Sequence, residues 1–306
     1  MALLKLIRWP NLLMIVFVQY LIRFMITESL DIPHVLNHLQ YFYGVLCSIS
    51  LAAAGYVIND ILDVSVDEHN KPQRVTVGKA FPDSVAWQIY FGLNILALFT
   101  GYLVAKAAGM PGLWMLPLIA IALLYFYSVD LKKRAIIGNV LVSLLTALPV
   151  ALVALFDLVP AVTDENRDIV RAAVEVVSAY ALFAFWSNFI REMIKDAEDY
   201  QGDARHGYRT LAVILGPRQV RYVIIILILV MLSFTGFYDV YLFASDHVSA
   251  IYIMLFVNLP LLYLIYLVIK SKTPADFKKA STLTKIIMLT GILSMVIFTL
   301  VLKFNW

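Results

Sequence analysis

The sequence predicts an all-α membrane protein, a polytopic bundle of nine transmembrane helices with a cytoplasmic N-terminus and the C-terminus outside. Three observations predict this fold. Of the 306 residues, 62% are hydrophobic and only 15% are charged, whereas soluble domains carry about 25% charged residues. The apolar residues gather in long runs, and the basic residues are concentrated on one side of those runs. We therefore expect a single transmembrane domain covering residues 1–306.

The nine predicted spans are runs that contain no Asp, Glu, Lys or Arg. A helix needs roughly 20 residues to cross about 30 Å of hydrocarbon. Five runs reach this length, namely Ile32–Asn59, Ser84–Ala105, Ala107–Val129, Ala135–Phe156 and Val248–Ile269. Four runs are slightly shorter, namely Trp9–Ile22, Val176–Ile190, Tyr222–Tyr238 and Ile286–Leu302.

The basic residues predict the orientation, because Lys and Arg are enriched in cytoplasmic loops. With the N-terminus inside, 19 of the 24 Lys and Arg residues fall in inner segments. The outer segments keep Arg23, Lys106, Arg167, Arg171 and Lys303. Reversing the topology or removing one span destroys this bias. We expect a multi-pass protein of the cell (inner) membrane.

The connections between spans differ in length and charge. The acidic segment 157–171 is expected to be a solvent-exposed outer loop, and longer inner connections are expected at about 64–83 and 191–221. The net charge of +3 does not point to nucleic acid, and we expect no nucleic-acid partner. The sequence contains no Walker loop, no G-x-G-x-x-G and no nucleophile elbow.

Two inner segments share the pattern D-x-x-D-x-x-x-D. The first carries Asp60, Asp63 and Asp67, after the second predicted span. In the second, after the sixth span, Asp196, Asp199 and Asp203 each follow their counterpart by 136 residues. Positions i, i+3 and i+7 lie on one face of a helix. Each motif therefore directs three carboxylates the same way, close to the cytoplasmic end of a span.

Three like charges within two helical turns need a counter-charge. Mg²⁺ prefers oxygen ligands and is commonly held by one or two carboxylates together with substrate phosphates. Two such motifs on different helices can hold Mg²⁺ ions that together neutralise one diphosphate. Basic residues of the inner segments can contact its outer oxygens, namely Lys71, Arg74, Lys132, Lys195, Arg205 and Arg209. Ordinary interfacial solvation explains a single acidic cluster better than two copies with identical spacing.

Other polar residues give weaker signals. Tyr127 ends the fourth span beside the basic cluster that begins at Lys132, but aromatic and basic residues are common at any membrane interface. Asn11 and Asn139 each lie just inside an apolar run. Both need hydrogen-bond partners in lipid, and a neighbouring helix can supply them.

With these residues the chain resembles the UbiA superfamily of intramembrane prenyltransferases over nearly its whole length. The resemblance rests on the Asn59–Asp67 and Asp196–Asp203 motifs, on Tyr127-Ser128 followed by Lys132, and on Gly138-Asn139. Within the superfamily, Arg191–Asp203 and Arg8-Trp9-Pro10-Asn11 are similar to the geranylgeranylglycerol-phosphate geranylgeranyltransferase branch. A departure lies at Asn70–Val75, where the family commonly has Asn-Arg-Pro-x-Arg-Pro.

The resemblance implies a magnesium-dependent transfer of a polyprenyl group, in this branch geranylgeranyl, from its diphosphate to a membrane-associated acceptor. It implies that the bilayer surrounds the protein and that the active site lies on the cytoplasmic side. The expected catalytic residues are Asp60, Asp63, Asp196 and Asp199, and Asp67 and Asp203 complete the metal ligands. The expected substrate-binding residues are Asn11, Asn59, Lys71, Arg74, Tyr127, Lys132, Asn139 and Lys195.

Two other functions are compatible with parts of the pattern. The acceptor is best matched by geranylgeranylglyceryl phosphate, but an aromatic acceptor of quinone biosynthesis is an alternative. An ion or phosphate transporter belongs to a different class. A transporter places ionisable groups near the bilayer midplane, whereas no acid lies inside any of the nine runs, which favours the enzyme.

Overall fold

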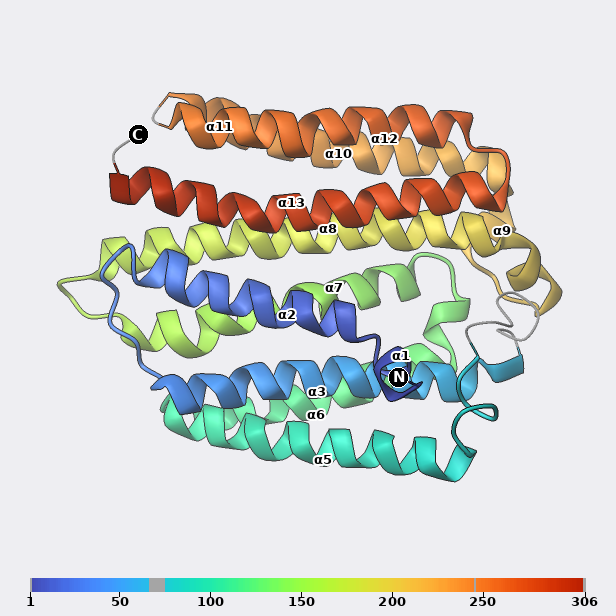
Figure 1. Ribbon diagram of the computed structural model, residues 1–306, viewed down its shortest axis with the longest axis horizontal. Coiled ribbons are helices and arrows are strands. Elements are labelled where there is room, and N and C mark those ends of the chain that lie inside the picture. Colours follow the sequence, from blue (N-terminus) through green and yellow to red (C-terminus); the bar gives the residue numbers. More distant parts are fainter. Residues whose placement is uncertain (1, 66–74, 245, 305–306) are drawn as a thin grey trace. The chain divides into compact units, whose positions relative to one another are not determined.

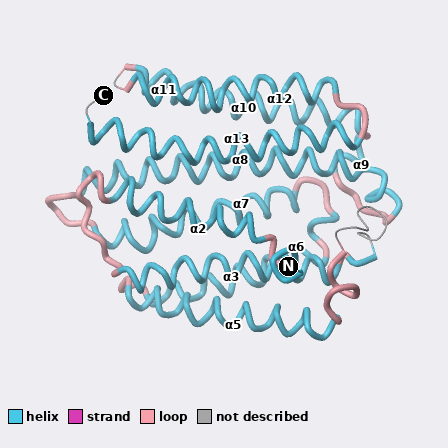
Figure 2. Tube along the Cα trace, viewed as in Figure 1, coloured by secondary structure: helices cyan, strands magenta, loops and turns pink. Residues whose placement is uncertain are grey.

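The computed structural model describes residues 2–65, 75–244 and 246–304. Asp67, Lys71 and Arg74 of the predicted site lie outside the described residues. Within the described ranges the chain is helical and has no strand (Figures 1 and 2), apart from two isolated β-bridges, Val77–Phe81 and Arg134–Arg209. The predicted all-α class is confirmed.

Nine helices in the described part of the chain are long and apolar enough to cross a membrane, which confirms the predicted number of spans. They are Trp9–Thr27, His38–Leu62, Asp83–Ala107, Pro111–Val129, Ile137–Ala161, Arg167–Arg205, Pro217–Phe243, His247–Lys270 and Pro274–Phe304.

The sixth helix, α8 (Arg167–Arg205), corrects one sequence-based boundary. Residues 191–205 were expected in an inner connection, but they continue the helix. With 39 residues, α8 is about 58 Å long at 1.5 Å per residue, which exceeds the roughly 40–45 Å of a bilayer with its headgroups. A charged extension beyond the apolar run therefore forms helix just as readily, and the absence of hydrophobicity there does not indicate a loop.

The chain divides into two compact units, which we call the first and the second unit. The first comprises residues 1–23, 30–132 and 148–178, and the second comprises 24–29, 133–147 and 179–306. Helices α7 (Ile137–Val153) and α8 contribute residues to both units.

The first unit is built around α3 (His38–Leu62), which packs against α2 (Trp9–Leu21), α5 (Asp83–Ala107) and α6 (Met115–Val129). The short α1 (Ala2–Leu6) contacts the same helix. Glycines allow these helices to approach closely: a Cβ at Gly101 would lie 2.4 Å from Pro117, and one at Gly55 would lie 2.8 Å from Leu124. The C-terminal end of α3, which carries the first motif, is thus fixed by helix packing.

A buried ion pair in the first unit corrects the expected loop assignments of Arg23 and Asp157. Arg23 Nη1 donates to Asp157 Oδ2 at 3.0 Å, and the two side chains are 2% and 1% exposed. Arg23 also donates to the Leu36 carbonyl, while the Leu36 N–H donates to Asp157 Oδ1. Both residues lie in π-helical segments, Ile22–Thr27 and Ala154–Leu158. The expectation that Asp157 begins a solvent-exposed connection is wrong, and Arg23 lies in a helical continuation of its span rather than in a connection.

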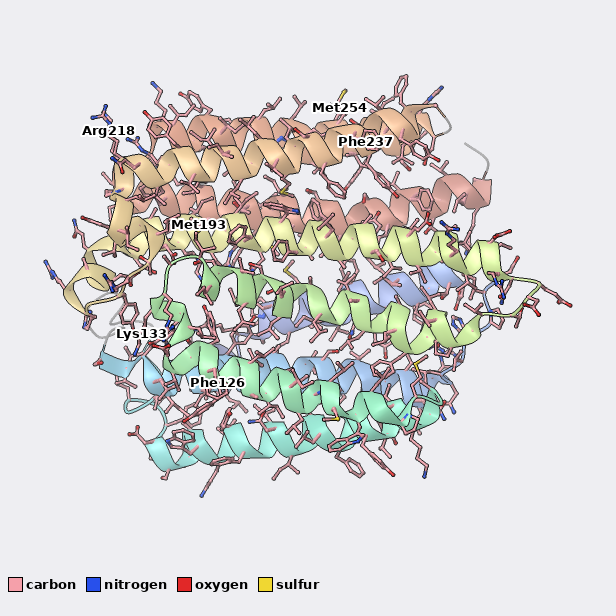
Figure 3. The ribbon with its side chains drawn as sticks, turned by 180° about the vertical axis from the view of Figure 1, so that it is seen from behind. Phe126, Lys133, Met193, Arg218, Phe237 and Met254 are labelled. Atoms are coloured by element: carbon pink, nitrogen blue, oxygen red, sulfur yellow. The ribbon has the colours of Figure 1, made fainter. Side chains whose placement is uncertain are left out.

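The second unit packs α8 with α10 (Pro217–Phe243), α12 (Leu259–Lys270) and α13 (Pro274–Phe304). Shorter helices α9 (Leu211–Leu215) and α11 (His247–Ile253) complete it. Met193 is fully buried in its core, whereas Phe237 is 75% exposed and projects away from its helix (Figure 3). Large apolar side chains on the outer surface suit a lipid environment rather than water.

Candidate active site

The first aspartate motif lies where α3 ends. Asn59 and Asp60 occupy its last turn, and Asp63 is the C-cap residue, whose N–H donates to the Asn59 carbonyl at 3.0 Å. The side chains of Asp60 and Asp63 are each 14% exposed. Two carboxylates are therefore largely withdrawn from water at the end of a membrane helix.

Asp60 is held by residues from two other segments of the first unit. Arg8 Nη2 donates to its Oδ1 at 2.8 Å, and Thr76 Oγ1 donates to its Oδ2 at 3.3 Å. The guanidinium of Arg8 also lies over the Tyr56 ring, 4.8 Å from its centroid. Arg8 has a left-handed backbone (φ 52°, ψ 52°) at the break before α2. The helix α2 begins at the next residue, Trp9, and Pro10 lies in its first turn.

Asp63 is paired with Lys132, which follows α6. Lys132 Nζ donates to Asp63 Oδ1 at 2.5 Å and to Asn59 Oδ1 at 3.0 Å, and its side chain is 9% exposed. The structure thus joins Lys132 to two residues of the first motif, and all three were predicted site residues. One buried cation holds both the first-motif asparagine and its second aspartate.

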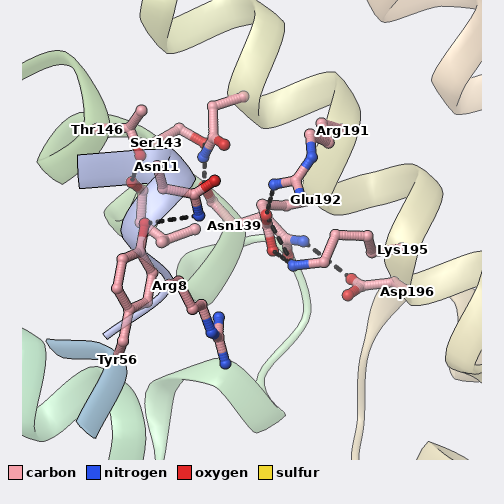
Figure 4. Close-up of polar contacts among 12 residues, drawn as sticks. Arg8, Asn11, Tyr56, Asn139, Ser143, Thr146, Arg191, Glu192, Lys195 and Asp196 are labelled. Carbon is pink, nitrogen blue, oxygen red and sulfur yellow. Dashed lines mark hydrogen bonds and ion pairs between the residues drawn. The ribbon is translucent and has the colours of Figure 1, made fainter. Parts of the chain in front are cut away.

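Asn11 and Tyr127 are the remaining predicted site residues of the first unit that the structure describes. Asn11 Nδ2 donates to the Tyr56 hydroxyl at 3.0 Å, so a residue of α3 supplies the hydrogen-bond partner that Asn11 needs. Tyr127 is half-buried in the last turn of α6. The contact between Asn11 and Tyr56 places Asn11 on the same aromatic ring that Arg8 covers (Figure 4).

The second motif lies within the continuous helix α8. Asp196, Asp199 and Asp203 are therefore at helical positions i, i+3 and i+7, as the spacing predicted. Asp203 is buried and Asp199 is half-buried. Because the three aspartates lie on one helix with this spacing, their side chains leave the same face of α8.

Asp196 is held by Asn139 from α7, a contact within the second unit. Asn139 Nδ2 donates to Asp196 Oδ2 at 2.9 Å, and Asn139 is 7% exposed (Figure 4). The adjoining polar contacts run along α7: Ser143 donates to the Asn139 carbonyl and accepts from Asn188. Ile136, just before α7, has φ 67°. A left-handed conformation is a strained exception for a β-branched residue.

Three charged residues lie on α8 just before Asp196 (Figure 4). Glu192 Oε1 accepts from Arg191 Nη1 at 3.0 Å, and both Glu192 oxygens accept from Lys195 Nζ, at 2.9 and 2.8 Å. The side chains of Arg191, Glu192 and Lys195 are 16%, 12% and 31% exposed. Sequence reasoning assigned only Lys195 to the site. It also gave no role to Tyr56, Thr76 or Glu192, whose residue types carry no signal without their partners.

The donor chemistry of both motifs fits Mg²⁺. Their available ligand atoms are carboxylate and amide oxygens, which hard cations prefer. Within the described residues, no three His, Cys, Asp or Glu side chains converge as a metal cage. Mg²⁺ does not require one, because it typically takes one or two carboxylates and fills its octahedron with waters and substrate phosphates. The residues present therefore suit a metal that arrives with an anionic substrate.

The comparison with protein families decides which family this fold belongs to. The model of the UbiA prenyltransferase family matches residues 20–292. The chain belongs to the UbiA prenyltransferase family. This multi-pass membrane protein is therefore a prenyltransferase, and the resemblance found in the sequence is confirmed.

Two similar proteins share the name digeranylgeranylglyceryl phosphate synthase. Digeranylgeranylglyceryl phosphate synthase of Saccharolobus solfataricus is 31% identical over 262 residues, covering 82% of this chain and 81% of that protein. The protein of the same name from Methanobrevibacter smithii is 27% identical over 306 residues and covers 98% of both.

Solved structures share the fold. A structure of digeranylgeranylglyceryl phosphate synthase in membranes has a TM-score of 0.69 at 23% identity and covers 97% of each chain. A UbiA homologue from Archaeoglobus fulgidus bound to GPP and Mg²⁺ has a TM-score of 0.55 at 14% identity, covering 97% of this chain and 100% of that one. The described part of this UbiA protein thus has the same overall fold as these solved structures.

Proposed function

We propose that this UbiA prenyltransferase transfers a geranylgeranyl group from its diphosphate to geranylgeranylglyceryl phosphate in a magnesium-dependent reaction. The observation that carries the proposal is the pair of aspartate motifs with identical spacing, at the end of α3 and in α8. The magnesium requirement is supported by the oxygen-only ligand atoms and by the Archaeoglobus fulgidus homologue, whose structure contains GPP and Mg²⁺.

The acceptor assignment is supported by the relatives. Proteins named digeranylgeranylglyceryl phosphate synthase match up to 98% of the chain. A glyceryl phosphate acceptor also suits a membrane enzyme, because its isoprenoid tail is as apolar as lipid while its phosphate requires the polar edge of the bilayer.

In the proposed site, Asp60, Asp63, Asp196, Asp199 and Asp203, together with Asp67, hold Mg²⁺. Bound Mg²⁺ acts as a Lewis acid that stabilises the negative charge of the departing diphosphate. Arg8 and Asn139 fix the orientation of Asp60 and Asp196. Lys132 and Lys195, with Lys71 and Arg74, contact phosphate oxygens of the substrates.

The proposed reaction has a simple balance. The bond between C1 of the donor and its diphosphate oxygen breaks, and the electron pair leaves with the diphosphate. The acceptor hydroxyl oxygen bonds to C1, and its proton is released to solvent water. Charged groups aimed at the leaving group act where negative charge develops, which is usually the largest contribution to catalysis. An apolar surrounding protects the electron-poor C1 from water.

A reconstituted transfer assay tests this function. The purified protein in liposomes receives geranylgeranyl diphosphate, Mg²⁺ and one of three acceptors: geranylgeranylglyceryl phosphate, 4-hydroxybenzoate or dihydroxynaphthoate. We expect equimolar digeranylgeranylglyceryl phosphate and diphosphate with the first acceptor only. Product with an aromatic acceptor alone would replace the proposed acceptor. Ion uptake without diphosphate release would favour a transporter.

We further propose that residues 1–306 act as one transferase domain, in the cell membrane, with the N-terminus and the active site on the cytoplasmic side and the C-terminus outside. The distribution of Lys and Arg supports this orientation.

A further inference from the structure

Basic side chains converge at one end of the second unit, where α10 begins, α12 ends and α13 begins. Arg221 of α10 joins these segments, because its Nη1 donates to the carbonyls of Ile269 at 3.0 Å and Ser271 at 2.9 Å. Arg218 lies about one turn earlier on α10 and projects outward (Figure 3). The basic residues of this surface, which we call the basic end, are Arg218, Arg221, Lys270, Lys272, Lys278 and Lys279.

The charge of the basic end is not balanced by nearby acids. The segment 270–285 contains five Lys residues and a single acid, Asp276. The Asp276 carboxylate accepts hydrogen bonds from residues 272 and 273, which caps the start of α13, and its charge acts on Lys279. Three exposed members of the basic end form no ion pair with any acid that the structure describes, namely Arg218, Lys272 and Lys278. Because like charges repel, an anion from outside the chain would stabilise this surface.

Exposed tyrosines lie one turn from the basic end, toward the apolar middle of the helices. On α10, Tyr222 follows Arg218 by four residues, so the two side chains are neighbours on one helix face. On α12, Tyr266 precedes Lys270 by four residues, and Lys270 Nζ lies 6.0 Å from the centroid of the Tyr266 ring. The two tyrosines are 63% and 53% exposed. A basic residue with an exposed tyrosine beneath it is typical of the boundary between lipid headgroups and hydrocarbon.

The combination of charge and exposed tyrosine indicates what kind of partner fits. The positive bias of cytoplasmic loops concerns the Lys and Arg content of each loop. It does not require two connections to meet in the folded protein, whereas Arg221 and Ser271 meet across 50 sequence positions. A nucleic acid or an acidic protein would match the charges but not the tyrosines, which lie within membrane-spanning helices. An amphiphile with an anionic headgroup matches both.

We propose that the basic end binds anionic phospholipids of the surrounding bilayer through their headgroup phosphate. The phosphate lies among Arg218, Lys272 and Lys278, and the first carbons of the lipid chains lie against the two tyrosines. Arg221 is a positioning residue that holds the start of α10 beside the end of α12. Clusters of basic residues beside a membrane attract anionic lipid more strongly with each added Lys or Arg. None of these residues belongs to the proposed transfer site, so the inference goes beyond the proposed function.

Thermal unfolding in mixed micelles tests the inference. The purified full-length protein in a neutral detergent is titrated with phosphatidylglycerol, which is anionic, or with phosphatidylcholine, which is neutral overall. A lipid that binds the folded state raises the unfolding midpoint, and the titration gives its apparent Kd. We expect phosphatidylglycerol to raise the midpoint of the wild type more than phosphatidylcholine does. Because salt screens exposed charges, 1 M NaCl should remove most of this difference.

Two triple variants locate the lipid contact. The first removes three charges of the basic end and combines Lys272→Gln, Lys278→Gln and Lys279→Gln. We expect its apparent Kd for phosphatidylglycerol to rise at least roughly ten-fold, because each basic residue near an anionic lipid contributes about five-fold. The matched control also removes three exposed basic side chains, and it combines Lys106→Gln, Arg167→Gln and Arg171→Gln. The control should keep the wild-type Kd. If the first triple variant fails to fold, Arg218→Gln takes its place, with an expected rise of about five-fold.

Three outcomes would overturn the inference. One is an unchanged Kd for phosphatidylglycerol in the variants of the basic end. Another is an equal loss in both triple variants, which would show a response to net charge rather than to this surface. The third concerns glycerol 3-phosphate, a soluble phosphate without lipid chains, added at matched ionic strength. We expect it to leave the midpoint unchanged, and a shift as large as that with phosphatidylglycerol would assign the basic end to a soluble phosphate instead of a lipid.

Discussion

Arg8 and Ile136 show how single residues position the motifs. Each adopts a positive φ without being glycine, Arg8 at 52° and Ile136 at 67°. Such conformations cost on the order of 1–3 kcal/mol and persist where the surroundings enforce them. Arg8 contacts Asp60 directly, and Ile136 precedes the helix that carries Asn139. Strained backbone thus accompanies both aspartate motifs.

At the residue scale the sequence predicted candidate site residues but not their hydrogen-bond partners. The apolar setting of Asn139 indicated a need for a hydrogen-bond partner, and Asp196 supplies it. Arg23 and Asp157 were placed in outer segments because each follows the end of a charge-free run. A pair of opposite charges can be buried when each satisfies the other, and two residues 134 positions apart give no sequence signal for such pairing.

The Arg23–Asp157 pair leads to a stability prediction. Asp157→Asn leaves the Arg23 charge buried without its counter-ion, and removing one partner of a buried pair typically destabilises a protein by about 3–5 kcal/mol. We expect a clearly lower midpoint of thermal unfolding in detergent. The control is Asp164→Asn, because Asp164 pairs with Arg167 in an exposed position, where its side chain is 96% exposed. Equal midpoints for the two variants would show that the buried pair adds nothing to stability.

At the scale of elements, periodicity was more informative than hydropathy. The i, i+3, i+7 spacing placed Asp196, Asp199 and Asp203 on one helix face, and α8 confirms that this segment is helical. Hydropathy located all nine spans but misplaced the end of α8, because it reports the surrounding solvent rather than the backbone conformation. The hydrogen bond from Asn139 of α7 to Asp196 of α8 could not be predicted from the sequence, because it depends on how the two helices pack.

Close helix packing in the second unit leads to a prediction at the same scale. A Cβ at Gly291 of α13 would lie 2.3 Å from the Phe183 ring on α8, whereas one at Gly236 of α10 meets nothing within 4 Å. We expect Gly291→Ala to destabilise the protein by about 1–3 kcal/mol through overpacking. Gly236→Ala should be neutral or stabilising by up to about 1 kcal/mol, because alanine favours helix. Thermal unfolding measures both, and a stable Gly291→Ala variant would contradict the packing.

At the scale of the whole molecule, the charge distribution predicts the orientation in the membrane. On a Cys47→Ala background, the Asp164→Cys variant should react with a membrane-impermeant maleimide added to intact cells. The Lys272→Cys variant should react only after the membrane is opened, because position 272 lies on the predicted inner side. Both positions are exposed, so access depends on the side of the membrane alone. The reverse labelling pattern would require the opposite topology.

The molecule carries its two aspartate motifs in two compact units, Asp60 in the first and Asp196 in the second. The repetition of one spacing in both units was visible in the sequence and is the basis of the functional account. The Arg8, Lys132 and Asn139 contacts that hold these aspartates explain why a change outside the motifs should also reduce activity. In the proposed function, both motifs therefore serve one reaction.

The most direct test is Mg²⁺-dependent diphosphate release from geranylgeranyl diphosphate by the reconstituted protein, with acceptor present. Asp60→Asn and Asp196→Asn should each lower the rate by at least roughly 100-fold, because a lost metal ligand removes several kcal/mol of transition-state stabilisation. Chelation of Mg²⁺ should have the same effect on the wild type, and Asp164→Asn should retain full activity. Wild-type rates in either motif variant, with the fold intact, would contradict the claim that both motifs activate the diphosphate.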